Sequence, residues 1–353
     1  MKKIILTGGG TAGHVTPNIA LIPELQKAGF TIDYIGSRAG IESELIKQCG
    51  IPFHPISSGK LRRYLSVKNI TDFFRVVQGL GDAFRLIRKI KPGIIFSKGG
   101  FVSVPVVIAG KLCGVPVIIH ESDLTPGLAN KIAIPFAARV CVSFPETLRY
   151  LPQKKAVMTG PPVRKNLLRG SREKGLALCG FSGEKPVLLV TGGSLGSVKI
   201  NTALRTCLPA LLPRFDIVHL CGKNNRDDAV AEKGYCQFDY LSDELPDVFT
   251  CCDLIVSRAG SNAIFEFLAL KKPNLLIPLS KNASRGDQIL NARSFEKSGF
   301  SKVLQEEELT EQSLAEAVDA LYQNKDGYIA EMSKNALNNG VREIMGLINQ
   351  LLA

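Results

Sequence analysis

The feature that most limits the possible folds of this chain is a short apolar run ending in a glycine-rich turn, which occurs in both halves. Residues Lys3–Thr7 lead into Gly8-Gly9-Gly10-Thr11-Ala12-Gly13-His14, and residues Pro186–Thr191 lead into Gly192-Gly193-Ser194-Leu195-Gly196-Ser197. Short apolar runs bounded by glycines and followed by amphipathic stretches are typical of parallel strands buried on both faces. The pattern therefore predicts an α/β fold in which strands alternate with helices.

The length of 353 residues suggests two such domains at about 150 residues each. A break is expected near Gly160-Pro161-Pro162, because two prolines continue neither a helix nor a central strand. We predict two doubly wound domains, residues 1–160 and 161–334, and a C-terminal amphipathic helix at about 335–353 that could pack back on the first. The other expected strands are Thr31–Ile35, Gly93–Ser97, Val115–His120, Arg139–Ser143, Asp216–Leu220, Leu254–Ser257 and Asn274–Pro278.

The net charge of +12 lies entirely in the first half of the chain. Residues 1–160 contain 21 basic residues (Lys and Arg) and 9 acidic residues (Asp and Glu), whereas residues 161–353 contain 23 basic and 23 acidic residues. A one-sided basic half favours an anionic partner, which can be nucleic acid, a membrane or a phosphorylated substrate. Only 7% of residues are aromatic and none is Trp, so stacking platforms for single-stranded nucleic acid are not expected.

Targeting and redox signals indicate an ordinary cytoplasmic protein. No apolar run reaches the roughly 18 residues of a membrane-spanning helix, and the N-terminus has no signal-peptide core or cleavage site. The nine Cys include no C-x-x-C spacing, which predicts reduced thiols that act as small core residues.

The first glycine-rich turn formally matches a dinucleotide-binding fingerprint, Gly8-x-Gly10-x-x-Gly13, between a strand and a helix. The second expected strand ends without the acidic residue that would bind a ribose, and Arg38 stands there instead. An NADP-dependent oxidoreductase is therefore one alternative.

Further polar residues follow the carboxyl ends of expected strands, where doubly wound sheets bind their ligands. In the first half these are His14 and the run His120-Glu121-Ser122-Asp123. The run is not H-E-x-x-H, and no Cys and His are paired at metal-ligand spacing, so no metal site is expected.

In the second half, the turn at Gly192–Ser197 could bind a diphosphate through backbone N–H groups and the Ser194 hydroxyl, and it lacks the Lys-Ser/Thr ending of a P-loop. Glu266 follows the helix start at Ser261–Asn262 and could accept both hydroxyls of a ribose. Gln288 and Asn291 lie beside Asp287 at another helix start, within reach of the hydroxyls of a sugar.

Together these segments resemble the MurG family of bacterial N-acetylglucosaminyltransferases, in forms typical of Gram-positive Firmicutes. The resemblance covers essentially the whole chain. It is carried, in order, by Gly8–Pro17, Lys98–Pro105, His120–Gly127, Gly192–Ser197 and Ser257–Asn262.

The resemblance implies a GT-B fold, with two Rossmann-like domains facing a cleft, and inverting transfer of GlcNAc from UDP-GlcNAc to the MurNAc C4 hydroxyl of lipid I, which gives lipid II. This chemistry needs a base for the acceptor hydroxyl, and our hypothesis for the base is His14, with Glu121 as its alternative or partner. We expect UDP-GlcNAc contacts at Thr11, Ala12, Gly13, Asp123, Arg164, Ser194, Leu241, Ser261, Asn262, Ala263, Ile264, Phe265, Glu266, Gln288 and Asn291. Contacts with the acceptor diphosphate are expected at Gly9, Gly10, Gly99, Gly100 and Ser103.

The sequence departs from the family pattern at two of the expected sugar contacts. Asp123 stands where many members have an Asn, and Asp287 stands where many have a Gln, so Asp287 is the less secure sugar contact. The uracil contact falls near Leu241 or Ser242, where the spacing is ambiguous. Another GT-B enzyme, such as a diacylglycerol glycosyltransferase or a UDP-GlcNAc epimerase, is the nearer alternative.

A lipid-linked acceptor would explain why the basic residues are concentrated in the first half of the chain. Residues 60–91 contain nine Lys and Arg against Asp72 and Asp82. Two interpretations stay open: an amphipathic helix whose stripe is core, or a helical hairpin, broken near Gly79-Leu80-Gly81, that rests on the anionic inner leaflet. The stripe consists of Ile70, Phe73, Phe74, Val77, Leu80, Phe84 and Ile87.

The expected partners are accordingly UDP-GlcNAc, lipid I and the membrane surface, with cell-wall and division proteins as further candidates and no nucleic acid. No cofactor is expected. The expected location is the cytoplasmic face of the cell membrane, bound peripherally.

Overall fold

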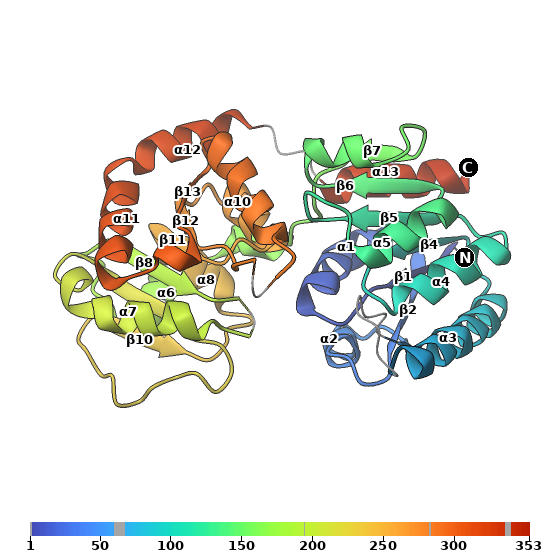
Figure 1. Ribbon diagram of the computed structural model, residues 1–353, viewed down its shortest axis with the longest axis horizontal. Coiled ribbons are helices and arrows are strands. Elements are labelled where there is room, and N and C mark those ends of the chain that lie inside the picture. Colours follow the sequence, from blue (N-terminus) through green and yellow to red (C-terminus); the bar gives the residue numbers. More distant parts are fainter. Residues whose placement is uncertain (1, 60–67, 194, 282–283, 336–339) are drawn as a thin grey trace. The chain divides into compact units, whose positions relative to one another are not determined.

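The computed structural model describes residues 2–59, 68–193, 195–281, 284–335 and 340–353, with side chains at 68–73 left out of the description. The chain divides into two compact units, Met1–Arg164 with Leu337–Ala353, and Lys165–Ala336. Each unit is built around one parallel sheet covered by helices (Figure 1). This is the predicted pair of Rossmann-like doubly wound folds.

The first unit contains a seven-stranded sheet in the order β3-β2-β1-β4-β5-β6-β7, with every strand pair parallel. The order runs outward in both directions from β1, so a switch point lies between β1 and β4. The strands are β1 (Lys2–Thr7), β2 (Phe30–Ser37), β3 (Phe53–Ile56), β4 (Ile94–Ser97), β5 (Val117–Glu121), β6 (Arg139–Val142) and β7 (Ala156–Met158).

Side chains of β1 alternate between two hydrophobic cores, one on each face of this sheet. Ile4 and Leu6 pack with α1 and α13, whereas Ile5 packs with α3 and α4. Successive strand side chains point to opposite faces, which is why a continuous apolar run is needed here. The helices are α1 (Thr16–Lys27), α2 (Glu42–Gln48), α3 (Lys68–Ile90), α4 (Ser103–Leu112), α5 (Leu128–Ala133) and α13 (Gly340–Leu352), with short 3₁₀ helices η1 (Ala12–His14), η2 (Ile134–Phe136) and η3 (Pro145–Tyr150).

The second unit repeats the scheme with a six-stranded parallel sheet in the order β10-β9-β8-β11-β12-β13. Its strands are β8 (Val187–Thr191), β9 (Asp216–Leu220), β10 (Tyr235–Phe238), β11 (Leu254–Ser257), β12 (Asn274–Leu276) and β13 (Ser301–Val303). Its helices are α6 (Arg172–Cys179), α7 (Val198–Leu211), α8 (Leu245–Cys251), α9 (Ser261–Ala269), α10 (Asp287–Lys297), α11 (Glu311–Gln323) and α12 (Lys325–Lys334), with η4 (Lys165–Arg169) and η5 (Glu306–Glu308).

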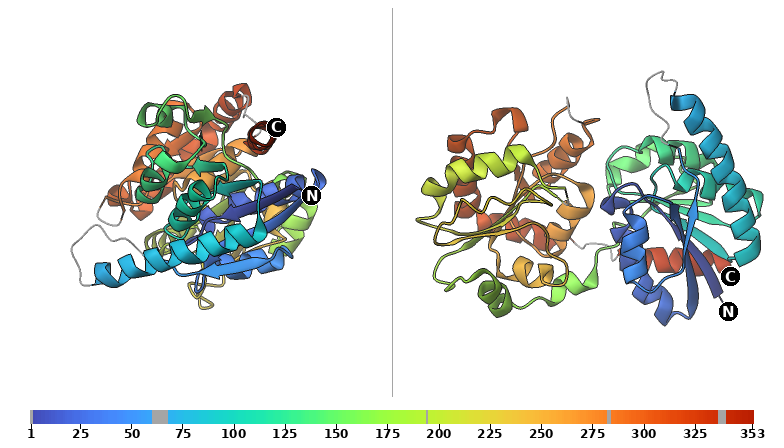
Figure 2. Two further views of the ribbon diagram at one scale, coloured as in Figure 1. Left: turned by 90° about the vertical axis from the view of Figure 1, so that its right-hand side faces the viewer. Right: turned by 90° about the horizontal axis from the view of Figure 1, so that it is seen from below.

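The C-terminal helix α13 belongs to the first unit, although the chain reaches it from the second (Figure 2). Val341, Ile344 and Ile348 are buried in the same cluster as residues of α1 and β1. Since these positions are three and four residues apart, they form one apolar face of the helix.

Helix α3 is continuous from Lys68 to Ile90, so the expected break near Gly79-Leu80-Gly81 is wrong. Gly79 instead lets the helix approach the chain after β3, because a Cβ there would collide with the carbonyl oxygen of Ser57. An isolated glycine in a helix is tolerated where packing requires it. In the described part of the chain, no helix is long and apolar enough to span a membrane.

Candidate active site

Three turns meet at the carboxyl edge of the first sheet because β1, β4 and β5 are neighbours. The turns are Gly8–Gly10, Lys98–Gly100 and Glu121–Asp123. A Cβ on Gly100, where φ is +83°, would collide with the carbonyl oxygen of Gly9. Glycine at this position is therefore required both by the backbone angle and by the close approach of two turns. Lys98 donates its backbone N–H to Thr7 O at 2.8 Å, which fixes the second turn against the first strand.

A carboxylate that the sequence analysis missed holds the first turn. Glu42 is fully buried at the start of α2, and it accepts hydrogen bonds from Gly10 N at 3.2 Å and from Ser37 N at 2.9 Å. The Ser37 hydroxyl donates to the same carboxylate. Nothing in the local sequence separates Glu42 from a solvated helix-start acid, because its partners lie on two other loops.

His14 lies at the end of η1, directly after the glycine-rich turn, and is half-buried. Its Nδ1 is 3.0 Å from the Thr11 hydroxyl. Thr11 and Gly13 are exposed and Ala12 is half-buried, so this short helix presents its residues at the edge of the unit. The geometry gives His14 a fixed ring orientation within reach of solvent.

Glu121 is buried at the end of β5 and accepts three hydrogen bonds. Its Oε1 accepts from Asp123 N at 3.0 Å, and its Oε2 accepts from Gly127 N at 2.9 Å and from Asn130 Nδ2 at 2.8 Å. Burial raises the pKa of Glu121, and the nearby Asp123 raises it further, while the three donors oppose the shift. The carboxylate thus folds the 121–127 loop onto the start of α5.

Two further titratable groups are buried beside Glu121. His120 donates through Nε2 to Gly160 O at 3.1 Å, and burial holds its pKa well below the ordinary value, with the Lys98 charge adding to the shift. Lys98 is only 2% exposed and donates to the Ser122 hydroxyl. Burial lowers the pKa of Lys98 to about 8, opposed by the charges of Glu121 and Asp123. A charged residue directly after a buried strand was the available signal for Lys98.

The residues expected at the acceptor diphosphate differ in access. Gly10 is exposed and Gly100 is half-buried, whereas Gly9 and Gly99 are buried. Ser103 is fully buried and donates its hydroxyl to Gly100 O at 2.8 Å. In this structure Ser103 stabilises the turn, and its contact with a diphosphate stays a prediction.

At the carboxyl edge of the second sheet, the turn after β8 leads into α7. Ser194 lies outside the described residues. Ser197 caps α7, with its hydroxyl accepting from Ile200 N at 3.4 Å. Leu195 is 83% exposed and Val198 is 72% exposed, an unusual exposure for apolar side chains at a turn. Exposed backbone before a helix of this length favours an anion.

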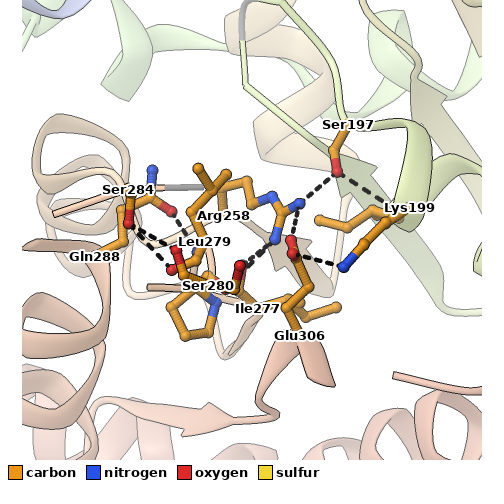
Figure 3. A network of polar contacts seen from close by, with 11 residues as sticks. Ser197, Lys199, Arg258, Ile277, Leu279, Ser280, Ser284, Gln288 and Glu306 are labelled. Carbon is orange, nitrogen blue, oxygen red and sulfur yellow. Dashed lines mark hydrogen bonds and ion pairs between the residues drawn. The ribbon is translucent and has the colours of Figure 1, made fainter. Parts of the chain in front are cut away.

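Arg258, which follows β11, is the centre of a polar network that joins three turns of this unit (Figure 3). It donates to the Ser197 hydroxyl at 2.7 Å and to Ile277 O at 3.2 Å, and it forms an ion pair with Glu306. Lys199 is 3.0 Å from the other oxygen of Glu306. Sequence analysis quoted Arg258 in a motif without giving it a role, and it missed Glu306, whose partners are far away in the chain.

The segment of α9 that is expected to contact the nucleotide has a mixed exposure. Ser261, Ile264 and Phe265 are buried, and Phe265 packs edge-on against Phe295. Asn262, Ala263 and Glu266 are half-buried. Any contact of Ile264 with a ligand would therefore use its backbone, whereas Glu266 can use its carboxylate.

The remaining expected donor contacts lie on several loops. The Gln288 side-chain oxygen accepts from Leu279 N at 3.1 Å (Figure 3), and the buried Asn291 donates to Ala259 O at 3.3 Å. Leu241 is 7% exposed. Arg164 and Asp123 are half-buried in the first unit.

Asp287 pairs with Arg285 at 2.7 Å, and its contact with a sugar stays a prediction. A pocket of about 300 Å³ lies beside the Arg258 network and is lined by Ser197, Lys199, Arg258 and Glu306 among others. Among the described residues, no group of three or more His, Cys, Asp or Glu could hold a metal ion.

Comparison with known proteins gives one family over both units. Residues 4–142 match the glycosyltransferase family 28 N-terminal domain, and residues 187–348 match the C-terminal domain of the same family. A protein of Geobacillus thermodenitrificans is 59% identical over 98% of both chains, and one of Clostridium botulinum strain Langeland is 57% identical over 99% of both. Both are named UDP-N-acetylglucosamine–N-acetylmuramyl-(pentapeptide) pyrophosphoryl-undecaprenol N-acetylglucosamine transferase. The crystal structure of Acinetobacter baumannii MurG is similar with a TM-score of 0.77 and 25% identity, covering 99% of this chain and all of that one.

Proposed function

Because the chain belongs to glycosyltransferase family 28, we propose that it catalyses the reaction for which its relatives are named. It transfers GlcNAc from UDP-GlcNAc to the MurNAc of undecaprenyl-pyrophosphoryl-MurNAc-pentapeptide, converting lipid I to lipid II in peptidoglycan synthesis. The observation that carries this conclusion is identity of 57–59% along essentially the whole chain.

The donor site is assigned to the carboxyl edge of the second sheet. The N-terminus of α7 offers backbone N–H groups and a favourable dipole to the UDP diphosphate. Glu266 binds the ribose hydroxyls, and the Arg258 network holds the α7 turn through Ser197. No Asp-x-Asp triplet occurs in the sequence, so we assign stabilisation of the leaving UDP to the α7 turn and Arg164 rather than to a metal ion.

His14 is the proposed general base for the acceptor hydroxyl. Inversion in one displacement requires a base on the acceptor side, within hydrogen-bond reach of the hydroxyl. In the proposed tautomer, Nδ1 of His14 carries the hydrogen and donates it to the Thr11 hydroxyl, which leaves Nε2 as the atom that takes the proton. Imidazole is the side chain best suited to exchange a proton near neutral pH, and here it is open to solvent on one side.

Glu121 is better suited to position the acceptor loop than to accept a proton. All three of its described partners donate to it, and each such bond stabilises the ionised carboxylate. Proton transfer to Glu121 would break this arrangement in the middle of the reaction. Glu121 is therefore proposed as a positioning residue that places Asp123 at the sugar.

Peripheral binding to the cytoplasmic face of the membrane is proposed through α3. Leu80, Phe84 and Ile87 pack in the core, so three of the seven residues of the predicted stripe are structural. Phe74 is 66% exposed and Val77 is 51% exposed, on a helix that also carries Arg85 and Arg88 and packs against α4. Ile70 and Phe73 lie outside the described side chains.

Among the described apolar side chains of α3, those of Leu80, Phe84 and Ile87 pack in the core, and those of Phe74 and Val77 are exposed to solvent. Apolar side chains among basic residues suit the surface of an anionic leaflet. Proteins of cell-wall synthesis and division stay candidate partners.

The oxidoreductase alternative is disfavoured by the first turn. In that alternative Gly10 N would donate to a pyrophosphate, but here it donates to Glu42, which already supplies a negative charge. Other GT-B enzymes share the donor chemistry and differ in the acceptor.

The test is release of UDP from UDP-GlcNAc with a lipid I analogue, compared with the same reaction without acceptor. Release that requires the analogue supports the proposal, and equal release in both contradicts it. Titration with UDP and with NADPH is the binding control, since only UDP should bind tightly.

A further inference from the structure

A second pocket lies at the opposite edge of the first sheet from Glu121 and the glycine-rich turns. It has a volume of about 480 Å³ and is formed by the segments that lead into β5, β6 and β7. These strands are parallel, so the segments meet at the amino edge, whereas Glu121 and the glycine-rich turns lie at the carboxyl edge. The five residues of β5 separate the two edges by roughly 15 Å.

The charge of this pocket is one-sided. Lys111, Arg139, Lys154 and Lys155 line it, and no lining residue is acidic. None of the four forms an ion pair with a carboxylate of the described residues. Cations gathered without a counter-charge repel one another, and a bound anion relieves that repulsion.

Two of the cations are held in place by backbone oxygens. Lys155 donates to Ile134 O at 3.1 Å and to Pro135 O at 2.8 Å, and Arg139 donates to Ala138 O at 3.0 Å. A lysine and an arginine that are already oriented lose less side-chain freedom when a ligand binds. The pocket is thus more than a patch of mobile surface lysines.

The walls between the cations are apolar. Val115, Val117 and Phe136 line the pocket together with Pro116 and Pro135. The volume falls in the range of small-molecule sites and exceeds what an inorganic ion fills. A ligand that fits therefore combines an anionic group with a carbon body.

We propose that this pocket is a binding site for an organic phosphate, with the phosphate among the four cations and the carbon body against the apolar wall. Planar guanidinium and flexible ammonium groups together suit phosphate oxygens. Such a ligand can be a free phosphate ester or the head group of an anionic phospholipid, which share this chemistry. The site uses neither the donor turn nor α3, so it does not depend on the proposed transferase or membrane assignments.

The test uses methyl NMR of the full-length protein saturated with UDP, so that the donor site is already occupied. Glycerol phosphate is titrated while the methyl signals of Val115 and Val117 are followed. Saturable shifts at these two valines, with those of the second-unit Val187 and Val190 unchanged, are expected. Val115 and Val117 signals that stay unchanged through the millimolar range would overturn the proposal.

A matched pair of variants separates the site from general charge. Lys111→Gln with Lys154→Gln removes two pocket cations, and Lys27→Gln with Lys47→Gln removes two exposed cations of α1 and α2. We expect about a tenfold or greater loss of affinity in the first variant, from two lost charge-assisted hydrogen bonds, and none in the second. Equal weakening in both would show general charge attraction and overturn the site.

Vesicles identify the source of the phosphate. Weaker sedimentation of the K111Q/K154Q variant than of the K27Q/K47Q variant with phosphatidylglycerol vesicles assigns the site to a lipid head group. Equal sedimentation of the two variants, together with loss of glycerol phosphate binding in the first alone, assigns it to a free phosphate ester. Phosphatidylcholine vesicles serve as the uncharged reference.

Discussion

Replacing Glu121 by Gln tests whether Glu121 is the general base or a residue that positions the loop after β5. The substitution keeps the size of the side chain, but an amide cannot act as a general base as a carboxylate can. In the wild-type protein, Oε2 accepts two hydrogen bonds and Oε1 accepts one. The amide introduced by E121Q can keep its oxygen at the Oε2 position, but its NH₂ group then faces Asp123 N.

The free-energy cost of E121Q follows from the number of hydrogen bonds that are lost. One hydrogen bond to a charged group is lost, which is about 1.5–3 kcal/mol, and a buried N–H is left without its acceptor. The loss should appear locally, as faster amide hydrogen exchange at Asp123, whereas exchange at Gly127 should stay unchanged because the amide oxygen still accepts from Gly127 N. If His14 is the base, kcat of E121Q should fall by about tenfold or less, whereas His14→Gln should lower it by roughly 10²–10⁴.

The assay is steady-state turnover of a lipid I analogue over a range of pH, alongside amide exchange for each variant. The acid limb of the rate profile, which reports the free base, should persist in E121Q and disappear in H14Q. A fall of about 10² or more in E121Q with unchanged exchange at Asp123 would refute this division of roles.

Further predictions concern the donor, the two buried charges and the membrane. Glu266→Ala should weaken UDP-GlcNAc binding by about 1.5–3 kcal/mol in calorimetry, because a charged acceptor of the ribose is lost. Arg258→Met should destabilise the second unit by about 3 kcal/mol, measured by hydrogen exchange in α7, because it leaves a buried carboxylate with one remaining cation. Burial lowers the pKa of Lys98 from 10.5 to about 8, so between these two pH values the unfolded chain binds more protons than the folded chain. The free energy of unfolding of the wild type, relative to that of K98M, should therefore rise from pH 8 to pH 10.5 and stay constant below pH 8. Arg85→Glu with Arg88→Glu should weaken sedimentation with anionic vesicles and leave UDP binding unchanged.

Each of these has a result that contradicts it. Unchanged donor affinity removes Glu266 from the site, and equal exchange in α7 would mean that Arg258 does not hold the turn. A difference in unfolding free energy between wild type and K98M that stays constant from pH 8 to 10.5 would show that burial does not lower the pKa of Lys98. Equal binding of wild type to neutral and anionic vesicles would assign the basic half to the acceptor alone.

The interior strands of both sheets were predictable from sequence, and the outermost strands were not. β3, β7, β10 and β13 are the edge strands, and each is short and only partly buried at most positions. A strand buried on both faces needs a continuous apolar run, but an edge strand does not. The run Phe53-His54-Pro55-Ile56 contains a proline, which a central strand would exclude.

The same contrast holds for the candidate site. Residues next to glycine-rich turns could be found, because a strand end followed by glycines has a sequence signal. Glu42, Lys98, Arg258 and Glu306 could not be assigned roles, since each acts through partners on loops that only the topology brings together. A buried charge and an exposed one look alike in a sequence until their partners are known.

The proposed reaction is the transfer of GlcNAc, with inversion at its anomeric carbon, to the acceptor hydroxyl. The most direct measurement is NMR of the product formed from UDP-GlcNAc and a lipid I analogue, reading the anomeric coupling and the carbon that bears the new bond. A β-linked GlcNAc on C4 of MurNAc, formed together with one UDP, is the predicted result. An α-linked product, or UDP-sugar epimerised without any transfer, would contradict it.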